Sequence, residues 1–460
     1  MKHVVIGCLI ANLCCGCAVR PAAPPQIDVP QHWSTATAPG AASVTSEWFR
    51  GFGSEELDEL VALAYRNNED LQAADARVRQ ADARARAAGA ALLPDISAAG
   101  NGTFNAGHSH DGTVTETDYS ALLSASYEID FWGKNRAGQM SARALREASE
   151  SDKAVVALTT VTEVANTYFQ VLELRERVAL ANRTLGNAKQ LLDLIEARRA
   201  VNLSNPVEVA QQRGVVAAAE IHVKEVEQQE IEQEAALAIL VGQVPGTLTV
   251  KAQSLSGLAP PQVAAGLPTE LLARRPDVFS AEQTLQSAHA DLLQARAAFF
   301  PAVTLTAGAG LANPAVNAAV NSLPGLGPSL TLGANVVQSI FNGGRLRAAR
   351  DEARGKEEEM LAQYRKAVLS ALWDVELALS AIEHLERQES AQKLSVEQGE
   401  QALSGAQARY QAGSGDFLAV LDAQRSLVTV QEQLSQYQLA RLQAAVGLCK
   451  ALGGGWVQKR

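Results

Sequence analysis

The chain has 460 residues, of which 47% are hydrophobic and 20% are charged, so it can bury a large core and is not disordered as a whole. Its formal net charge of −10 argues against nucleic acid as a partner, because binding to phosphate groups depends on basic surfaces. Aromatic residues make up only 5% of the chain and alanine is abundant, a composition that suits closely packed helices.

Residues 1–16 have the pattern of a signal peptide. A basic start precedes an apolar run over residues 4–13, which is too short to span a bilayer as a helix. Gly16-Cys17 resembles the end of a bacterial lipoprotein signal, in which the cysteine becomes the first mature residue and carries lipid. We therefore expect a covalent lipid on Cys17 and no other cofactor. The alternative is plain secretion with cleavage nearby.

Residues 17–56 are predicted to be the lipidated N-terminus and a tether. Between residues 18 and 46 the sequence is rich in Pro, Ala, Ser and Thr, which indicates an extended segment rather than a folded unit. One acyl chain gives only marginal membrane binding, so a firm anchor at Cys17 would require several.

The remainder of the chain contains the same order of sequence features twice. Residues 277–300 are rich in helix-forming residues, and Pro301 ends the helix because it lacks an N–H and its ring clashes with the preceding turn. Residues 302–311 then alternate as a strand does. The same order occurs earlier, where Ala91-Leu92-Leu93-Pro94 aligns with Ala298-Phe299-Phe300-Pro301 and Phe131-Trp132-Gly133 aligns with Phe341-Asn342-Gly343.

A repeat of about two hundred residues is far longer than a solenoid unit, so it indicates a duplicated half-protein. We place the two copies at residues 57–250 and 269–452. A linker at 251–268 separates them, and a C-terminal tail occupies 453–460.

Four segments alternate apolar and polar residues: 95–105, 119–131, 302–311 and 329–341. Each has about ten residues or slightly more, the length of a strand in a membrane β-barrel. A half-buried sheet in a soluble sandwich would give the same alternation. The secretory start and the scarcity of charge on the apolar faces favour the barrel.

Four strands cannot close a membrane barrel, which needs about eight or more, and open sheet edges are not tolerated in lipid. The strand count therefore predicts an oligomer. Two copies would supply eight strands and three would supply twelve, and the strand count alone does not decide between them.

Long helices account for most of the rest. Apolar residues recur at spacings of three and four over residues 137–200, as in coiled-coil packing. A break follows, and a helix over 207–241 returns antiparallel. The second copy repeats this with a helix over 345–411, a turn at 412–416 and a return helix over 417–452.

The chain resembles the TolC family of outer-membrane efflux ducts, and within it the NodT/OprM-like lipoprotein branch. The resemblance covers the mature chain and is carried by Cys17-Ala18-Val19 with Pro21, Arg274-Arg275-Pro276-Asp277-Val278, Ala295-Arg296-Ala297-Ala298-Phe299-Phe300-Pro301, Phe341-Asn342-Gly343-Gly344, and Lys450-Ala451-Leu452-Gly453-Gly454-Gly455-Trp456.

The resemblance implies a mainly α fold with a membrane β part. A homotrimer would form a 12-stranded transmembrane β-barrel in the outer membrane, continued by a long α-helical barrel in the periplasm. It further implies a lipid-anchored exit duct that joins a periplasmic membrane-fusion adaptor and an inner-membrane RND-type pump. Such ducts export drugs or other small solutes.

In this family the two helix turns form a periplasmic gate. The first turn includes Arg198-Arg199, Asn205-Pro206 and Glu208, and the second runs from Arg409-Tyr410 to Asp416, followed by Asp422. The resemblance assigns the gate to Asn205, Glu208, Arg409, Tyr410, Asp416 and Asp422. Tyr410 and Glu208 match a gate pair, and Asp422 matches a ring aspartate.

The sequence departs from the family at two gate positions. Ala419 stands where a second ring aspartate occurs, and Gly415 where an arginine occurs, so the resemblance does not define the detailed network. For Arg409 or Glu208 taken alone, a solvated charge at a helix end is the competing interpretation.

No catalytic residues are predicted, because no nucleophile lies in a pattern that would pair it with a base. The run His108-Ser109-His110-Asp111 could suggest a metal site, but we interpret it as a polar loop between two strands. Two further functions remain as alternatives: a duct for type I protein secretion and a non-conducting coiled-coil spacer lipoprotein.

Overall fold

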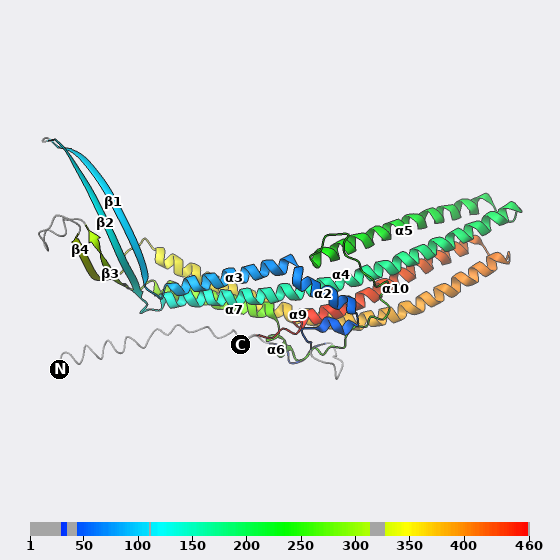
Figure 1. Ribbon diagram of the computed structural model, residues 1–460. Helices are drawn as coiled ribbons and strands as arrows, with labels where there is room; N and C mark the ends of the chain where they lie inside the picture. The colour runs from blue at the N-terminus through cyan, green and yellow to red at the C-terminus, as the bar shows by residue number, and fades with distance from the viewer. Residues whose placement is uncertain (1–28, 35–43, 110–111, 313–326, 459–460) are drawn as a thin grey trace. The chain divides into compact units, whose positions relative to one another are not determined.

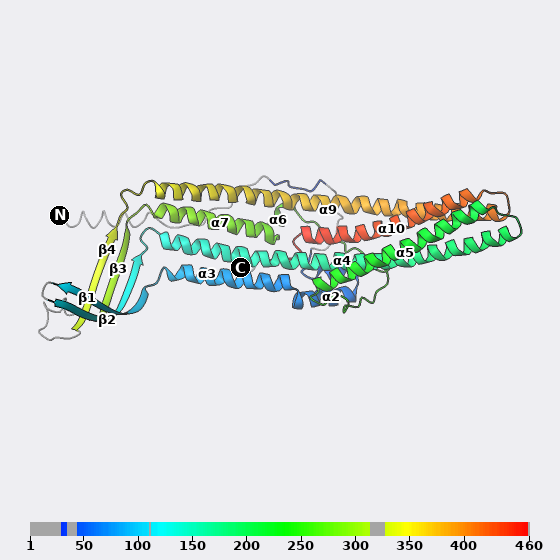
Figure 2. The same cartoon turned by 90° about the horizontal axis from the view of Figure 1, so that it is seen from above.

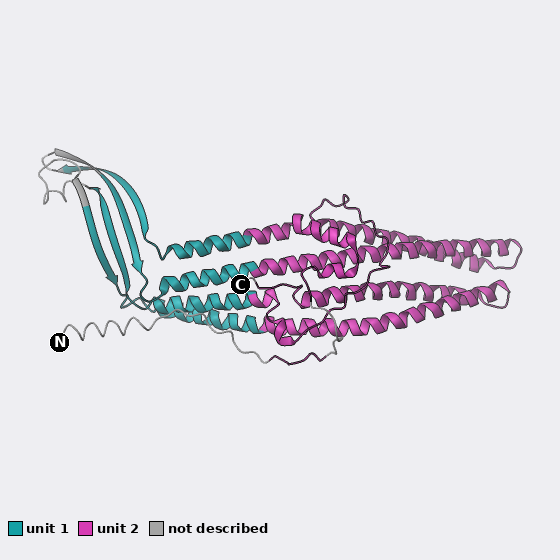
Figure 3. Ribbon diagram, turned by 60° about the horizontal axis from the view of Figure 1, so that its bottom comes forward, with its two compact units in different colours: residues 1–26, 77–150, 280–365 teal, residues 27–76, 151–279, 366–460 magenta. Residues whose placement is uncertain are grey.

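The computed structural model describes residues 29–34, 44–109, 112–312 and 327–458. They form two compact units, shown in Figure 3. Unit 1 contains the described residues within 77–150 and 280–365, and unit 2 those within 27–76, 151–279 and 366–460. Cys17 lies outside the described residues.

The predicted duplication of the fold is confirmed (Figure 1). In each half a helix leads to two strands, a long helix, a tight turn and a return helix. The two long helices have 67 residues each and the two return helices 35 each. The first half comprises α3 (Glu69–Ala90), β1 (Asp95–Ser109), β2 (Gly112–Ile129), α4 (Lys134–Ala200) and α5 (Pro206–Leu240), and the second α7 (Pro276–Ala297), β3 (Ala302–Ala312), β4 (Gly327–Val337), α9 (Arg345–Gln411) and α10 (Phe417–Ala451).

Unit 1 contains the four-stranded sheet, in the order β1-β2-β3-β4 with every pair antiparallel. The register aligns the apolar positions of neighbouring strands on one face. Leu123 pairs with Ala98 on one side and Ala309 on the other, and Ala309 pairs with Leu330. The opposite face is polar, where the hydroxyls of Ser97 and Ser124 lie 2.8 Å apart.

The predicted strand ends were wrong at two places. The second strand ends at Ile129 rather than at 131, because the Asp130 carboxylate accepts hydrogen bonds from the backbone N–H groups of Asn135 and Arg136 and so caps α4. The fourth strand ends at Val337 rather than at 341, and glycines with φ values of 63° and 88° at 343 and 344 turn the chain into α9.

The first hairpin is also longer than expected, since β1 and β2 pair as far as Ser109 and Gly112. His108 and Ser109 therefore belong to a strand and not to the polar loop that we expected. His110 and Asp111 lie outside the described residues.

Within unit 1, Trp132 links the end of β2 to the residues just before β3. Its ring stacks on Phe300 with the centroids 4.7 Å apart, and its Nε1–H donates to the carbonyl of Pro301 at 2.8 Å. The repeated Phe-Trp-Gly and Phe-Phe-Pro motifs thus meet where β2 ends and β3 begins.

Unit 2 contains most of the buried core. A short 3-10 helix η1 (Trp48–Phe52) and helix α2 (Glu55–Asn67) place aromatic and aliphatic side chains against α4 and α10. Phe52 lies 5.0 Å from Phe169, measured between ring centroids. Figures 1 and 2 both show α5 alongside α4 and α10 alongside α9. Among the described residues, no helix is long and apolar enough to cross a membrane.

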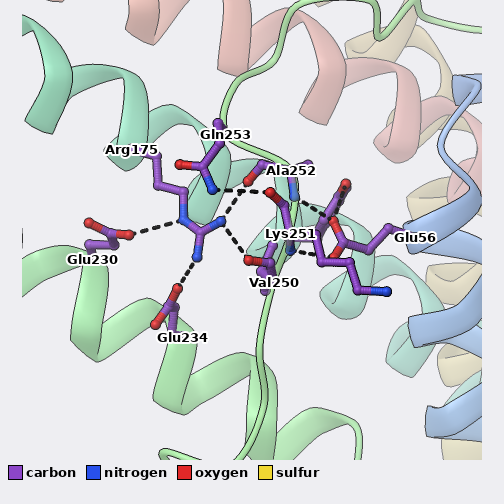
Figure 4. A network of polar contacts seen from close by, with 9 residues as sticks. Glu56, Arg175, Glu230, Glu234, Val250, Lys251, Ala252 and Gln253 are labelled. Atoms are coloured by element: carbon purple, nitrogen blue, oxygen red, sulfur yellow. Dashed lines mark hydrogen bonds and ion pairs between the residues drawn. The ribbon is translucent and has the colours of Figure 1, made fainter.

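A polar network anchors the segment between α5 and α6 (Pro268–Leu271) in unit 2 (Figure 4). Arg175 of α4 donates to Glu230 at 3.0 Å and Glu234 at 2.5 Å on α5, and to the carbonyls of Val250 and Ala252. The Glu56 carboxylate on α2 accepts from the backbone N–H groups of residues 251 and 252. A charge-assisted network of this kind fixes an otherwise irregular segment.

Candidate functional site

The first helix turn joins α4 to α5 and is built by backbone hydrogen bonds. The N–H of Leu203 donates to the carbonyl of Arg198 at 2.8 Å, and the N–H of Asn202, at a φ of 60°, donates to the carbonyl of Arg199 at 2.9 Å. Asn205 caps α5, because its Oδ1 accepts from the N–H groups of residues 207 and 208 at 2.8 and 2.9 Å.

The second turn, between α9 and α10, has the same construction. The N–H of Ser414 donates to the carbonyl of Arg409 and that of Gly413, at a φ of 74°, to the carbonyl of Tyr410, both at 3.0 Å. The Asp416 carboxylate caps α10 by accepting from the N–H of Leu418 at 3.2 Å. The repeat therefore places Arg198 and Arg409 at equivalent positions.

The two turns meet at Tyr410. Its hydroxyl donates to Oε2 of Glu208 at 3.2 Å, and the Ser204 hydroxyl donates to the same oxygen. The Tyr410 ring is 5% exposed and packs 5.4 Å from Phe417 in a cluster with Leu191, Ile195, Val209, Val420 and Leu421. Burial raises the pKa of Tyr410, and the neighbouring Glu208 charge raises it further, so the phenol remains a donor.

Of the six predicted gate residues, the structure brings Glu208 of the first turn into direct contact with Tyr410 of the second. Asn205 and Asp416 each cap the helix of their own turn. Arg409 and Asp422 are exposed, and neither side chain has a hydrogen-bonding or ionic partner among the described residues.

Sequence reasoning omitted Arg198 from the gate. Its guanidinium lies over the Tyr410 ring, 4.8 Å from the centroid, and Nη1 donates to the carbonyls of Tyr410 and Gln411 at 3.3 and 3.4 Å. The repeat offered a signal, since Arg198 occupies the position of Arg409. Over the described part of the chain, no group of three or more His, Cys, Asp or Glu side chains forms a metal site.

Comparison with known proteins identifies the family. The family described as "Outer membrane efflux protein" matches residues 60–243 and 267–454. The chain belongs to this family. It is thus an exit duct of efflux pumps in the outer membrane, and the family consists of channels rather than enzymes.

Curated relatives match along nearly their whole length. The chain is 43% identical over 442 residues to the pyoverdine export outer membrane protein OpmQ of Pseudomonas aeruginosa, covering 94% of this chain and 92% of the relative. It is 30% identical over 449 residues to the cation efflux system protein CusC of Escherichia coli K12, covering 96% of both. These names favour efflux over the protein-secretion and spacer alternatives.

Solved channels share the fold. The chain is similar to a structure of CusC with a TM-score of 0.82 and 29% identity, covering 95% of this chain and 100% of the other. It is also similar to the open state of the Neisseria gonorrhoeae MtrE outer membrane channel, with a TM-score of 0.84 and 26% identity, covering 96% and 98%.

Proposed function

We propose that this efflux duct is a homotrimer that forms one 12-stranded barrel and is gated at the two helix turns. The observation that carries the proposal is the sheet of unit 1. It has one apolar face, and its edge strands β1 and β4 each pair with a strand on one side only among the described residues. Unpaired edges are not tolerated in lipid, so further copies of the chain must cover them.

Exposed apolar side chains on the helices of unit 2 support association with other copies. Leu369, Trp373 and Leu377 lie one helical turn apart on α9 and are 60%, 63% and 50% exposed. On α5, Ile221 and Ile231 are each 61% exposed. An apolar stripe such as the one on α9 normally lies against another helix.

The gate function rests on the contact between the turns. Tyr410 and Arg198 link the end of α9 to the first turn, and the hairpins cannot separate unless these bonds break. Each bond is weak where water reaches it, but three copies would add their contributions. The turns are therefore suited to hold a closed state that a partner can open.

We further propose that the duct works with a periplasmic membrane-fusion adaptor and an inner-membrane RND-type pump, and that Cys17 carries its lipid anchor. The lipid is supported by the relative SilC of Salmonella typhimurium, named a probable outer membrane lipoprotein, which is 29% identical over 443 residues. The cargo is a small solute. Names of relatives mention pyoverdine, cations and antibiotics, which indicates that one fold accepts different cargoes.

The test is electrical and uses purified, detergent-extracted protein in a planar bilayer, with the mass of the oligomer determined in parallel. We expect a trimer with discrete conductance steps and a circular dichroism spectrum that contains a β-barrel component. A monomer without that component would overturn the shared barrel. A stable trimer that never conducts, even with Glu208 and Tyr410 both replaced by alanine, would overturn the gated duct.

A further inference from the structure

Arg198 occupies the point where the two turns of one chain meet. It lies in the last turn of α4, and its partners lie at the last turn of α9, 212 and 213 positions further along the chain. Its Nη1 donates to the carbonyls of Tyr410 and Gln411 at the end of α9, and the Tyr410 carbonyl also accepts from the backbone N–H of Gly413. A cation is also favoured at this negative end of the helix dipole.

The same guanidinium covers the Tyr410 ring, with Cζ 4.8 Å from the centroid. Tyr410 is therefore bonded both at its backbone and at its hydroxyl. Arg198 fixes its backbone carbonyl and the face of its ring, whereas Glu208 accepts from its hydroxyl. With the ring fixed by Arg198 and Phe417, the hydroxyl faces Glu208 and Ser204 and donates to Glu208.

The contacts of Arg198 leave its hydrogen-bonding capacity incomplete. Nε is buried and has no acceptor among the described residues, and no carboxylate of the described chain lies within 4.0 Å of the guanidinium. Neutral carbonyls and an aromatic face hold a partly buried charge less firmly than a carboxylate pair does. A contact of this kind can hold the two turns together and can also be broken.

We propose that Arg198 is a positioning residue of the gate, holding the end of α9 against α4 and orienting Tyr410 toward Glu208. This inference rests on the gate of the proposed function and adds the residue that keeps it closed within each chain. The equivalent Arg409 does not perform this role, because its side chain is exposed and has no partner among the described residues.

The experiment measures open probability in planar bilayers, together with the unfolding temperature of the oligomer. Arg198→Ala should raise the open probability about fivefold or more, the lower range of coupling between two sites in proteins. Arg199→Ala is the matched control, because the neighbouring Arg199 is exposed and its side chain has no partner in the described part of the chain. Arg198→Lys keeps the charge but cannot lie flat on a ring while bridging two carbonyls, so it should close the gate only in part.

A second comparison separates positioning from simple stabilisation. Tyr410→Phe keeps the ring under Arg198 and removes only the hydroxyl, with its bond to Glu208 and its contact with Ser204. If Arg198 orients the hydroxyl, Arg198→Ala should have a smaller effect in the Tyr410→Phe background than in the wild type. Equal effects in both backgrounds would overturn the positioning role, as would a lower unfolding temperature with an unchanged open probability.

Failure of this inference is distinguishable from failure of the proposed function. If Glu208→Ala opens the duct and Arg198→Ala and Arg198→Lys do not, the gate stands and Arg198 is not part of it. If the trimer and all of these variants remain silent, the gate itself and this inference are both overturned.

Discussion

The guanidinium of Arg275 lies 2.9 Å from a carboxylate oxygen of Asp374, although 99 positions separate them in the chain. Arg275 is 8% exposed and also contacts Asp277 at 2.6 Å and the carbonyl of Ala451 at 3.2 Å. One side chain thus connects the start of α7, the middle of α9 and the end of α10 within unit 2.

Arg275→Ala should destabilise the protein by about 2–3 kcal/mol, because it leaves two carboxylates and a carbonyl without their donor. We expect this loss of stability to be smaller than for a fully buried ion pair, because the Asp277 and Asp374 side chains are 37% and 35% exposed. The measurement is thermal unfolding of the purified oligomer followed by circular dichroism.

The neighbouring residue supplies the control. Arg274 makes an exposed pair with Glu270 at 3.3 Å, and such pairs contribute about 0–1 kcal/mol. Arg274→Ala should therefore leave the unfolding temperature nearly unchanged. Equal losses in the two variants would show that the buried network is not the source of the stability.

Cys449 should not react with maleimide at pH 8 while the protein is folded. Burial raises the pKa of its thiol to about 12, so only about one thiol in ten thousand is ionised at that pH, and the thiolate is the reactive form. Intact-mass analysis of the mature protein should show modification only after denaturation. Rapid modification of the native oligomer would mean that α10 is accessible where the structure buries it.

The sequence predicted the elements better than the contacts between them. Period-2 alternation identified which residues share a sheet face, and the pairing of Leu123 with Ala98 and Ala309 bears this out. The end of the second strand was wrong because alternation continues into Asp130, which caps a helix instead. Capping depends on the direction in which the next element leaves, and periodicity contains no information about that direction.

Two of the motifs that carried the resemblance, residues 274–278 and 450–456, lie together in unit 2. Gly453 has a φ of 84°, and a Cβ there would lie 2.0 Å from the carbonyl oxygen of Arg274. The rings of Phe279 and Trp456 are 5.8 Å apart. The role of Arg198 was not predictable in this way, because it depends on side-chain geometry between turns about two hundred residues apart.

Asp422→Ala should change the ion conductance and selectivity of the duct without affecting its folding. The side chain is exposed on α10, and surface substitutions of this kind usually change stability by less than about 0.5 kcal/mol. The reversal potential in a salt gradient measures the selectivity. Asp422→Asn removes the charge and keeps the shape, so it should have the same effect. Unaltered single-channel behaviour in both variants would exclude Asp422 from the gate.

Glu173→Gln should stabilise the protein at neutral pH. Glu173 on α4 is 3% exposed and lies 3.7 Å from Arg177, and burial raises the pKa of its carboxyl despite that partner. The folded state therefore holds this proton more tightly than the unfolded state does. The contribution of Glu173 to stability is fully present below its ordinary pKa of about 4.5. It is lost as the pH rises from there to the higher pKa of the folded state.

A glutamine is neutral throughout this range. The variant should therefore be more stable than the wild type by on the order of 1 kcal/mol at pH 7.5 and equally stable at pH 4. Unfolding temperatures at the two pH values measure the difference. Glu232→Gln is the control, because Glu232 lines the same hollow between α4, α5 and α10 but is exposed. If Glu173→Gln lowers stability at pH 7.5, the attraction between Glu173 and Arg177 outweighs the cost of burying the charge, and the pH dependence has the opposite sign.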